Sequence, residues 1–294
     1  VASLLQRNIA TRLDAQGRPT PLIAETGGMN AMIVDSSALT EQVVVDVLAS
    51  AFDSAGQRCS ALRVLCLQDD VADHTLKMLR GAMAECRMGN PGRLTTDIGP
   101  VIDAEAKANI ENHIQTMRAK GRPVFQAVRE NSEDAREWQT GTFVPPTLIE
   151  LASFDELKKE VFGPVLHVVR YNRNNLNELI DQINASGYGL TLGVHTRIDE
   201  TIAQVTGNAK VGNLYVNRNM VGAVVGVQPF GGEGLSGTGP KAGGPLYLYR
   251  LLANRPENAL GVTLARQDAD YPVDAQVKAV LTQPLDALIK WAEN

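Results

Sequence analysis

Cys59 and Glu25 are the side chains in this sequence whose type and setting best suit covalent chemistry. Cys59 lies in SAGQRCSA, after a glycine and an arginine and before Ser60 and an apolar run. A thiol at such a loop-to-strand junction, close to positive charge and backbone N–H groups, is expected to have a lowered pKa and to react as a thiolate. Glu25 lies in AETGGMN, where two glycines let the backbone turn sharply beside the carboxylate. These two residues predict a thiol nucleophile served by a carboxylate.

Each of the two residues is also compatible with a purely structural role. A cysteine is often a small buried hydrophobe, as we expect for Cys66 inside an apolar strand and for Cys86 at a helix end. Glu25 alone would fit a surface turn. The spacing favours the chemical interpretation, because the 34 positions between Glu25 and Cys59 are enough for one strand, one helix and a turn back to the same sheet edge.

The rest of the chain supplies the elements that would hold such a pair in place. Short apolar runs alternate with helix-period segments, which predicts an α/β fold with a largely parallel sheet flanked by helices. The predicted strands are residues 22–24, 31–34, 62–67, 123–128, 142–148, 166–171, 190–195 and 211–216. The predicted helices are residues 39–52, with Ser36, Ser37 and Thr40 as candidate caps, then 70–84, a helix that begins at Asp103 and ends near Gly121, 176–185 and 199–209.

Three stretches lie outside this alternation. Residues 222–245 are dense in glycine and contain Pro229, Pro240 and Pro245, which predicts a long loop of the kind that often carries function. The polar tail beyond Arg255 is expected to be a linker or the start of a further module. At the other end, an amphipathic stretch begins in mid-pattern from Val1, so we expect this chain to be a piece of something longer.

Composition excludes several classes of function. The 28 Lys and Arg against 33 Asp and Glu give a net charge of −5, which argues against a nucleic-acid-binding surface. No run of about eighteen apolar residues is present, so we expect no membrane segment. The 3 cysteines are too few and too irregularly spaced for a disulfide framework or a structural zinc site. These features favour a cytoplasmic protein.

Two further patterns are rejected as sites. His74, His113, His167 and His195 lie singly on predicted helices or strands, so we expect neither a ligand pair nor a metal centre. The glycines at 232, 234 and 237 have the G-x-G-x-x-G spacing of a dinucleotide fingerprint. The next residues are Thr-Gly-Pro and not a helix, so no helix N-terminus is available for a pyrophosphate.

Four ordered motifs give the chain a family resemblance. They are ETGG at Glu25, GQRC ending at Cys59, KKEVFGPV at residues 158–165 and QPFGGEGLSGTG at residues 228–239. Together they resemble the aldehyde dehydrogenase superfamily. The sequence of residues 217–232 is similar to that of the branch that oxidises L-glutamate γ-semialdehyde, the open form of 1-pyrroline-5-carboxylate. Nearly the whole chain resembles the dehydrogenase half of the bacterial bifunctional proline utilisation proteins.

The resemblance implies a role for each motif. Cys59 would attack the aldehyde to form a thiohemiacetal, and Glu25 would activate water to hydrolyse the resulting thioester. Glu160 and Phe162 would contact the ribose and nicotinamide of NAD. For the substrate, the resemblance implies that Ser60 and the loop at Gly222 and Ala223 hold the α-carboxylate, and that Phe230 lines the aldehyde tunnel.

The resemblance also implies a domain plan. Residues 1–24 would be a remnant of the NAD-binding domain, most of which is expected outside this chain together with an FAD-dependent proline dehydrogenase part. Residues 25–238 would form the catalytic domain and residues 239–294 a C-terminal segment or linker. Since the family's oxyanion-hole asparagine and adenosine pocket precede its glutamate motif, we expect this chain alone to be nearly inactive. Its exposed N-terminal surface would favour a homo-oligomer or contact with the rest of a bifunctional polypeptide.

Two alternatives to this enzyme remain open. One is a non-catalytic scaffold module with the same fold, which would not need a thiol and two carboxylates around one cleft. The other is an aldehyde dehydrogenase of broad substrate range, which would share the chemistry. Selective alkylation of Cys59 separates the first alternative from an enzyme, and turnover of short aliphatic aldehydes separates the second.

Overall fold

The computed structural model describes residues 2–128, 138 and 140–252. Contacts divide the chain into two units, residues 1–243 and 244–294. The first unit holds the α/β fold, and the described part of the second contains the short helix α8 (Tyr247–Leu251). The tail beyond Arg255 lies outside the described residues.

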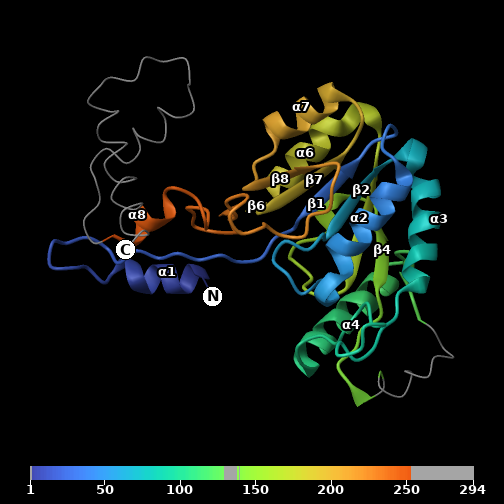
Figure 1. Cartoon of the computed structure of the whole chain (residues 1–294), viewed down its shortest axis with the longest axis horizontal. Helices are drawn as coiled ribbons and strands as arrows, with labels where there is room; N and C mark the ends of the chain where they lie inside the picture. Colours follow the sequence, from blue (N-terminus) through green and yellow to red (C-terminus); the bar gives the residue numbers. More distant parts are fainter. Residues whose placement is uncertain (1, 129–137, 139, 253–294) are drawn as a thin grey trace. The chain divides into compact units, whose positions relative to one another are not determined.

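A seven-stranded sheet forms the centre of the first unit, in the order β3-β4-β5-β2-β1-β7-β8 (Figure 1). All neighbouring pairs are parallel except the edge pair β3 and β4. The strands are β1 (Ala31–Val34), β2 (Val64–Gln68), β3 (Val124–Gln126), β4 (Thr147–Leu151), β5 (Val165–Tyr171), β7 (Thr191–His195) and β8 (Asn213–Val216). This architecture confirms the predicted α/β class and the largely parallel sheet.

Helices cover both faces of the sheet, with α2 and α3 on one side of the strands and α6 and α7 on the other (Figure 1). Every residue of β1, β2 and β7 is buried, as expected for parallel strands between two helical layers. The helices are α1 (Ala2–Ala10), α2 (Thr40–Phe52), α3 (Asp69–Glu85), α4 (Ala104–Ala119), α6 (Leu176–Ala185) and α7 (Asp199–Asn208). Asp103 caps α4 as predicted, with its side chain accepting from the N–H of Ala106.

Three local predictions were wrong, each because of a contact that local sequence does not reveal. Residues 22–24 form no strand of the sheet, since Ala24 bonds to Thr238 of the glycine-rich loop. Ser37 does not cap α2, because its hydroxyl donates to Asp35 at 2.6 Å. The predicted strand at 142–148 is shifted to Thr147–Leu151, since two prolines precede Thr147 and lack the N–H that a ladder needs.

The predicted loop at 222–245 is confirmed as mostly irregular. Its short strand β9 (Glu233–Gly234) pairs with β6 (Tyr188–Gly189), and Glu25 forms an isolated bridge with Gly237. No helix follows Gly237 until α8, so the G-x-G-x-x-G spacing does not mark a dinucleotide fold. The loop instead lies against the segment that carries Glu25.

Candidate active site

Glu25, Cys59 and Glu160 lie at the same edge of the sheet. Each precedes by five or six residues a strand of the parallel set, β1, β2 and β5 respectively. Because these strands are adjacent and parallel, their amino ends and the segments before them gather at one edge. The topology therefore assembles three of the four sequence motifs in one place.

Asn30 fastens the Cys59 segment to the first residues of β1. Its buried amide nitrogen donates to the carbonyls of Cys59 at 2.7 Å and Ala61 at 2.8 Å. The amide oxygen of Asn30 accepts from the N–H of Thr191 on β7 at 3.2 Å. A Cβ at Gly28 would meet this oxygen at 2.4 Å, so the second glycine of ETGG leaves room for the Asn30 side chain.

The Cys59 thiol is partly buried, and its pKa is raised above the ordinary value. Burial is the largest cause, and the carboxylates of Glu160 and Glu25 add to it, while backbone N–H groups of Ser60 and Cys59 act in the opposite direction. The predicted lowering of the thiol pKa was wrong, because burial of the thiol outweighs the effect of the backbone N–H groups, and the two carboxylates raise the pKa further. Both carboxylates therefore lie within electrostatic range of the Cys59 thiol.

The Glu25 carboxylate packs closely against glycines of the 228–239 segment. Its Oε2 accepts from the N–H of Gly232 at 3.1 Å. A Cβ at Gly231 or at Gly237 would meet a carboxylate oxygen of Glu25 at 3.0 Å. Partial burial raises the pKa of Glu25, and the Gly232 N–H partly offsets the rise. A carboxylate of raised pKa near a thiol is suited to general-base chemistry.

Glu160 and Phe162 lie on the other side of the Cys59 segment. Glu160 forms an ion pair with the buried Arg63 at 3.1 Å, and burial raises its pKa against the opposing effects of Arg63 and the Gly28 N–H. The Phe162 ring is 46% exposed and lies 4.9 Å from the Arg63 guanidinium carbon. An exposed aromatic ring beside a carboxylate is a surface that a ribose and a flat heterocycle would fit.

The four candidate substrate residues fall into two groups. A Cβ at Gly222, whose φ is +54°, would lie 3.9 Å from the hydroxyl oxygen of Ser60, so this turn directly faces Ser60. The Tyr215 hydroxyl donates to the Gly222 carbonyl at 3.2 Å and holds the turn there. Ala223 and Phe230 line a neighbouring cavity of about 330 Å³ within the glycine-rich loop.

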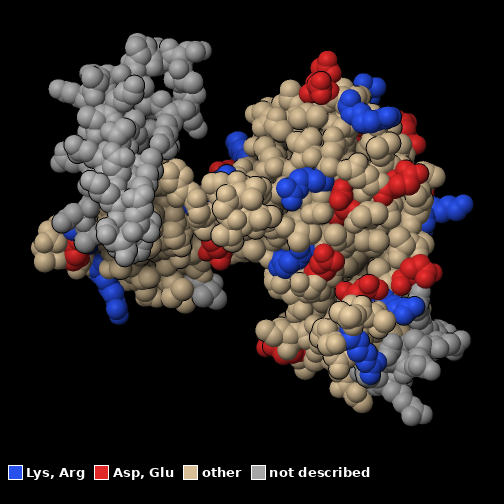
Figure 2. Space-filling view, in the orientation of Figure 1, with Lys and Arg blue, Asp and Glu red and all other residues tan. Residues whose placement is uncertain are grey.

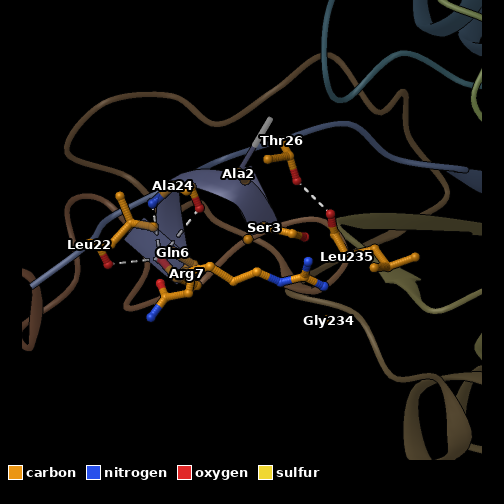
Figure 3. Close-up of a pocket in the computed structure, with 11 residues that line it drawn as sticks. Ala2, Ser3, Gln6, Arg7, Leu22, Ala24, Thr26, Gly234 and Leu235 are labelled. Carbon is orange, nitrogen blue, oxygen red and sulfur yellow. Dashed lines mark hydrogen bonds between the residues drawn. The ribbon is translucent and has the colours of Figure 1, made fainter. Parts of the chain in front are cut away.

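A larger cavity, of about 390 Å³, lies beside Glu25 on the α1 side (Figure 3). It is lined by α1, by Ala24 and Thr26 on either side of Glu25, and by the loop at Gly234–Thr238. The Thr26 hydroxyl donates to the Leu235 carbonyl across its wall at 2.5 Å (Figure 3). Cys59 is not among its lining residues.

The prediction that the histidines lie singly was wrong. Nε2 of His113 on α4 lies 2.8 Å from Nε2 of His167 on β5. His167 Nδ1 lies 3.1 Å from the Arg63 carbonyl, so Nδ1 donates there and Nε2 accepts from His113. Burial lowers the pKa of His167 to about 3, which keeps it neutral. Among residues 2–128, 138 and 140–252, no group of three or more His, Cys, Asp or Glu side chains could hold a metal ion.

Charged side chains are mixed over the α/β part of the surface. On the face shown in Figure 2, Lys and Arg alternate with Asp and Glu, in keeping with the net charge of −5. None of the described helices has the length and apolar character of a membrane span.

Comparison with known proteins decides the family. The sequence profile of the Aldehyde dehydrogenase family matches residues 5–253. The chain belongs to the aldehyde dehydrogenase family. It is 90% identical to Bifunctional protein PutA of Escherichia coli (strain K12), over all of this chain and 22% of that protein. It is 35% identical to a 1-pyrroline-5-carboxylate dehydrogenase of Bacillus cereus (strain B4264), over 77% of this chain and 43% of the relative.

Solved structures agree with this assignment. The fold superposes on a crystal structure of bifunctional proline utilization A (PutA) protein with a TM-score of 0.77 and 52% identity, over 85% of this chain and 24% of that one. A solved 1-pyrroline-5-carboxylate dehydrogenase gives a TM-score of 0.72 and 33% identity, over 85% of this chain and 47% of that one. The chain thus spans about a fifth of the length of the PutA relatives that it matches.

Sequence reasoning missed three residues that position the candidate site residues: Asn30, Arg63 and Tyr215. A signal for Arg63 was present, because a lone arginine in the apolar run LRVLCL must be paired if that strand is buried. Asn30, next to the predicted strand 31–34, also stood out as a polar residue at a buried strand start. Nothing local marked Tyr215, whose partners lie in the glycine-rich loop.

Proposed function

We propose that this chain carries the catalytic thiol of a dehydrogenase that oxidises L-glutamate γ-semialdehyde, formed from 1-pyrroline-5-carboxylate, to L-glutamate. One observation carries the proposal. The Cys59 thiol lies at the same edge of the sheet as two carboxylates, Glu25 and Glu160, and their charges raise the pKa of the thiol. The substrate is inferred from the relatives that are 1-pyrroline-5-carboxylate dehydrogenases. In this proposal Cys59 and Glu25 are catalytic residues.

The chemistry follows from those two side chains. The Cys59 sulfur, after the thiol has released its proton, attacks the aldehyde carbon; the C=O π pair moves to the oxygen, and the new S–C bond gives a thiohemiacetal. When bound, NAD supplies the acceptor for the hydride that leaves this carbon. Glu25 then takes a proton from water while the water oxygen attacks the thioester carbon, the C–S bond breaks, and the thiolate is regenerated. Burial raises the pKa of Glu25, which makes its carboxylate a stronger base.

Glu160 and Phe162 are the residues proposed to hold the nicotinamide end of NAD. The exposed Phe162 ring offers a flat apolar surface, and the Glu160 carboxylate offers acceptors for ribose hydroxyls. Most of the cofactor site is proposed to lie outside this chain, with residues 1–24 belonging to it. An FAD-dependent proline dehydrogenase part would belong to the same longer polypeptide.

The substrate's α-carboxylate is proposed to bind between Ser60 and the turn at Gly222 and Ala223. A hydroxyl and backbone N–H groups bind a carboxylate without an amine that could condense with the aldehyde. The close approach of Gly222 to the Ser60 hydroxyl supports this arrangement. Phe230 would line the path of the aliphatic part. Residues 25–238 form the catalytic domain in this plan, and residues 239–294 a further segment.

The test grafts this chain in place of its counterpart in the full-length Escherichia coli PutA relative. We expect the chimera to reduce NAD with L-glutamate γ-semialdehyde at a kcat/KM at least tenfold above that for butyraldehyde. Cys59→Ser should lower turnover by about a thousandfold or more. Glu25→Gln should form NADH in a single burst and then stall at the thioester. Glu178→Gln, on the exposed face of α6, is the matched control.

Each arm of this test has a contradicting outcome. Equal kcat/KM for both aldehydes would replace the proposed substrate with a broad range. Unchanged turnover in Cys59→Ser would contradict the enzymatic role of this thiol and leave a scaffold module.

A further inference from the structure

Arg63 is a fully buried arginine that none of the four motifs contains. It lies directly before β2, and its side chain has no exposed surface. Removing a guanidinium from water is costly unless its donors are paired. The arrangement of those donors therefore shows what the residue does.

All three guanidinium nitrogens of Arg63 are engaged, and they reach two separate segments. Nη1 donates to the Gly56 carbonyl at 2.7 Å, and Nη2 donates to the Arg58 carbonyl at 3.0 Å, both in the segment that leads to Cys59. Nη1 also donates to the Gly163 carbonyl at 3.2 Å. Nε and Nη2 donate to the same Glu160 oxygen, at 3.2 and 3.1 Å.

The two segments that Arg63 joins are themselves in close contact. A Cβ at Gly56 would meet the Gly163 carbonyl oxygen at 2.2 Å, so the two backbones touch where the guanidinium bridges them. The Phe162 ring packs against the guanidinium 4.9 Å from its centre. One planar group thus contacts the nucleophile segment, the carboxylate and the aromatic ring.

We propose that Arg63 is a positioning residue that fixes the Glu160–Gly163 segment relative to the segment ending at Cys59. This inference rests on the proposed function, since it concerns the distance between the reacting thiol and the residues that hold the nicotinamide end of NAD. Among the described residues, Arg63 forms no hydrogen bond to the Cys59 sulfur. It acts through Glu160, Phe162 and the carbonyls before Cys59.

Stability alone is a weak reason for such a buried pair. Replacing a buried ion pair by apolar groups is often neutral or stabilising, so the geometric role is the better explanation for a charge here. A planar fork with five donors serves several acceptors at fixed angles, which a lysine ammonium does not. Arginine is therefore required in the proposal and lysine is only a partial substitute.

The effect of the Arg63 charge on the Cys59 thiol pKa gives a second way to test where the guanidinium lies. Glu160 raises the pKa of the Cys59 thiol, and a thiolate at Cys59 raises the pKa of Arg63. Because such coupling is mutual, the Arg63 charge favours the thiolate. Removing Arg63 should raise the thiol pKa, and removing Glu160 should lower it.

The test measures the rate at which iodoacetamide alkylates Cys59 in the full-length chimera at pH 8, followed by mass spectrometry of the Cys59 peptide. Arg63→Met should slow alkylation about threefold or more, Glu160→Gln should speed it, and the double variant should lie within about twofold of the parent. Arg170→Met is the matched control, because Arg170 pairs with Asp73 and Glu150 at the other end of β5. Equal rates in Arg63→Met and Arg170→Met would overturn the proposal.

Two further comparisons keep the test decisive. If Arg63→Met does not fold, the double variant is compared with Glu160→Gln alone, and equal alkylation rates would overturn the proposal. Arg63→Lys, which keeps the charge without the fork, should raise the KM for NAD about tenfold with little change in the KM for the aldehyde. Equal effects on both KM values would indicate a merely structural role. Alkylation shifts in a chimera without dehydrogenase turnover would sustain the Arg63 contacts and contradict the proposed function.

Discussion

The two edges of the same parallel sheet are built in different ways. At the carboxyl edge, Asp35 accepts from the Ser37 N–H at 2.8 Å, from the Ser37 hydroxyl at 2.6 Å and from the Thr196 hydroxyl. There Asn217 bridges the segments after β7 and β8 through Thr196. These hydrogen bonds join the segments that follow β1, β7 and β8. The bonds hold these loops together, and the Asp35 carboxylate accepts three of them.

The amino edge has the opposite character. It brings together a thiol, two carboxylates with raised pKa values and a set of glycines whose missing side chains make room for those carboxylates. In most open α/β sheets ligands bind beyond the carboxyl ends of the strands. Here the chemistry-bearing residues lie at the other end. In our proposal the site lies at the amino ends of the strands, where paired charges and glycines gather, so the general rule for open α/β sheets does not locate it.

The largest effect that would sharpen this comparison is expected at Gly27. A Cβ there would meet the Glu160 Oε2 at 1.8 Å, so Gly27→Ala must displace that carboxylate. A displacement of about 1 Å at a positioning group can cost a hundredfold, and we expect kcat/KM for NAD in the chimera to fall at least tenfold. Gly81→Ala on α3 is the control, since nothing lies within 4 Å of its added Cβ. Equal kinetics for the two variants would contradict the amino-edge site.

Acid should destabilise the fold through the buried histidine beneath the amino edge. The pKa of His167 is lowered to about 3 in the folded chain, so the unfolded chain binds more protons below its ordinary pKa of 6.5. Protonation of His167 therefore does not affect the free energy of unfolding above pH 6.5. Below that pH the free energy of unfolding falls as the pH drops toward 3, by on the order of a few kcal/mol. Urea unfolding between pH 7 and pH 4 measures this loss. His167→Gln should flatten the pH dependence, and an equally steep profile in that variant would contradict the assignment.

A smaller effect, confined to stability, is expected at the carboxyl edge. Asp35→Asn replaces a carboxylate that accepts three hydrogen bonds, and should lower the free energy of unfolding by about 1–3 kcal/mol. Because this edge carries no chemistry in our account, the alkylation rate of Cys59 should stay unchanged. A slowed or accelerated thiol in a folded Asp35→Asn protein would break the distinction between the edges.

How much could be predicted from sequence differs between the fold and the site. The strand at 31–34 and the helix at 176–185 were predicted with the bounds that the structure has, because hydrophobic periodicity is a local signal. The segment at 22–24 was mispredicted because its partner, Thr238, is 214 positions away. The direction of the Cys59 pKa shift was mispredicted because it depends first on burial of the thiol, which local sequence does not show. Local sequence showed the arginine beside the thiol and not the two carboxylates that folding brings to it.

The sequence motifs identified the candidate reacting residues, whereas the contacts of these residues became known only from the fold. Glu25, Cys59 and Glu160 were selected by type and by family resemblance, and their shared sheet edge followed from strand order. Gly231, Gly232 and Gly237 were noted as part of the motif at residues 228–239, and the last two also as members of a rejected fingerprint, but their contacts with Glu25 were not predicted. Their role depends on a close backbone approach that no local pattern encodes.

The central claim is that the Glu25 carboxylate and the Cys59 thiol face one site, and the alkylation rate of Cys59 in Glu25→Gln tests it most directly. If the two groups are neighbours, loss of the Glu25 charge lowers the thiol pKa, and iodoacetamide should modify Cys59 about twofold faster or more at pH 8 than in the Glu178→Gln control. Identical rates in the two folded variants would contradict the account.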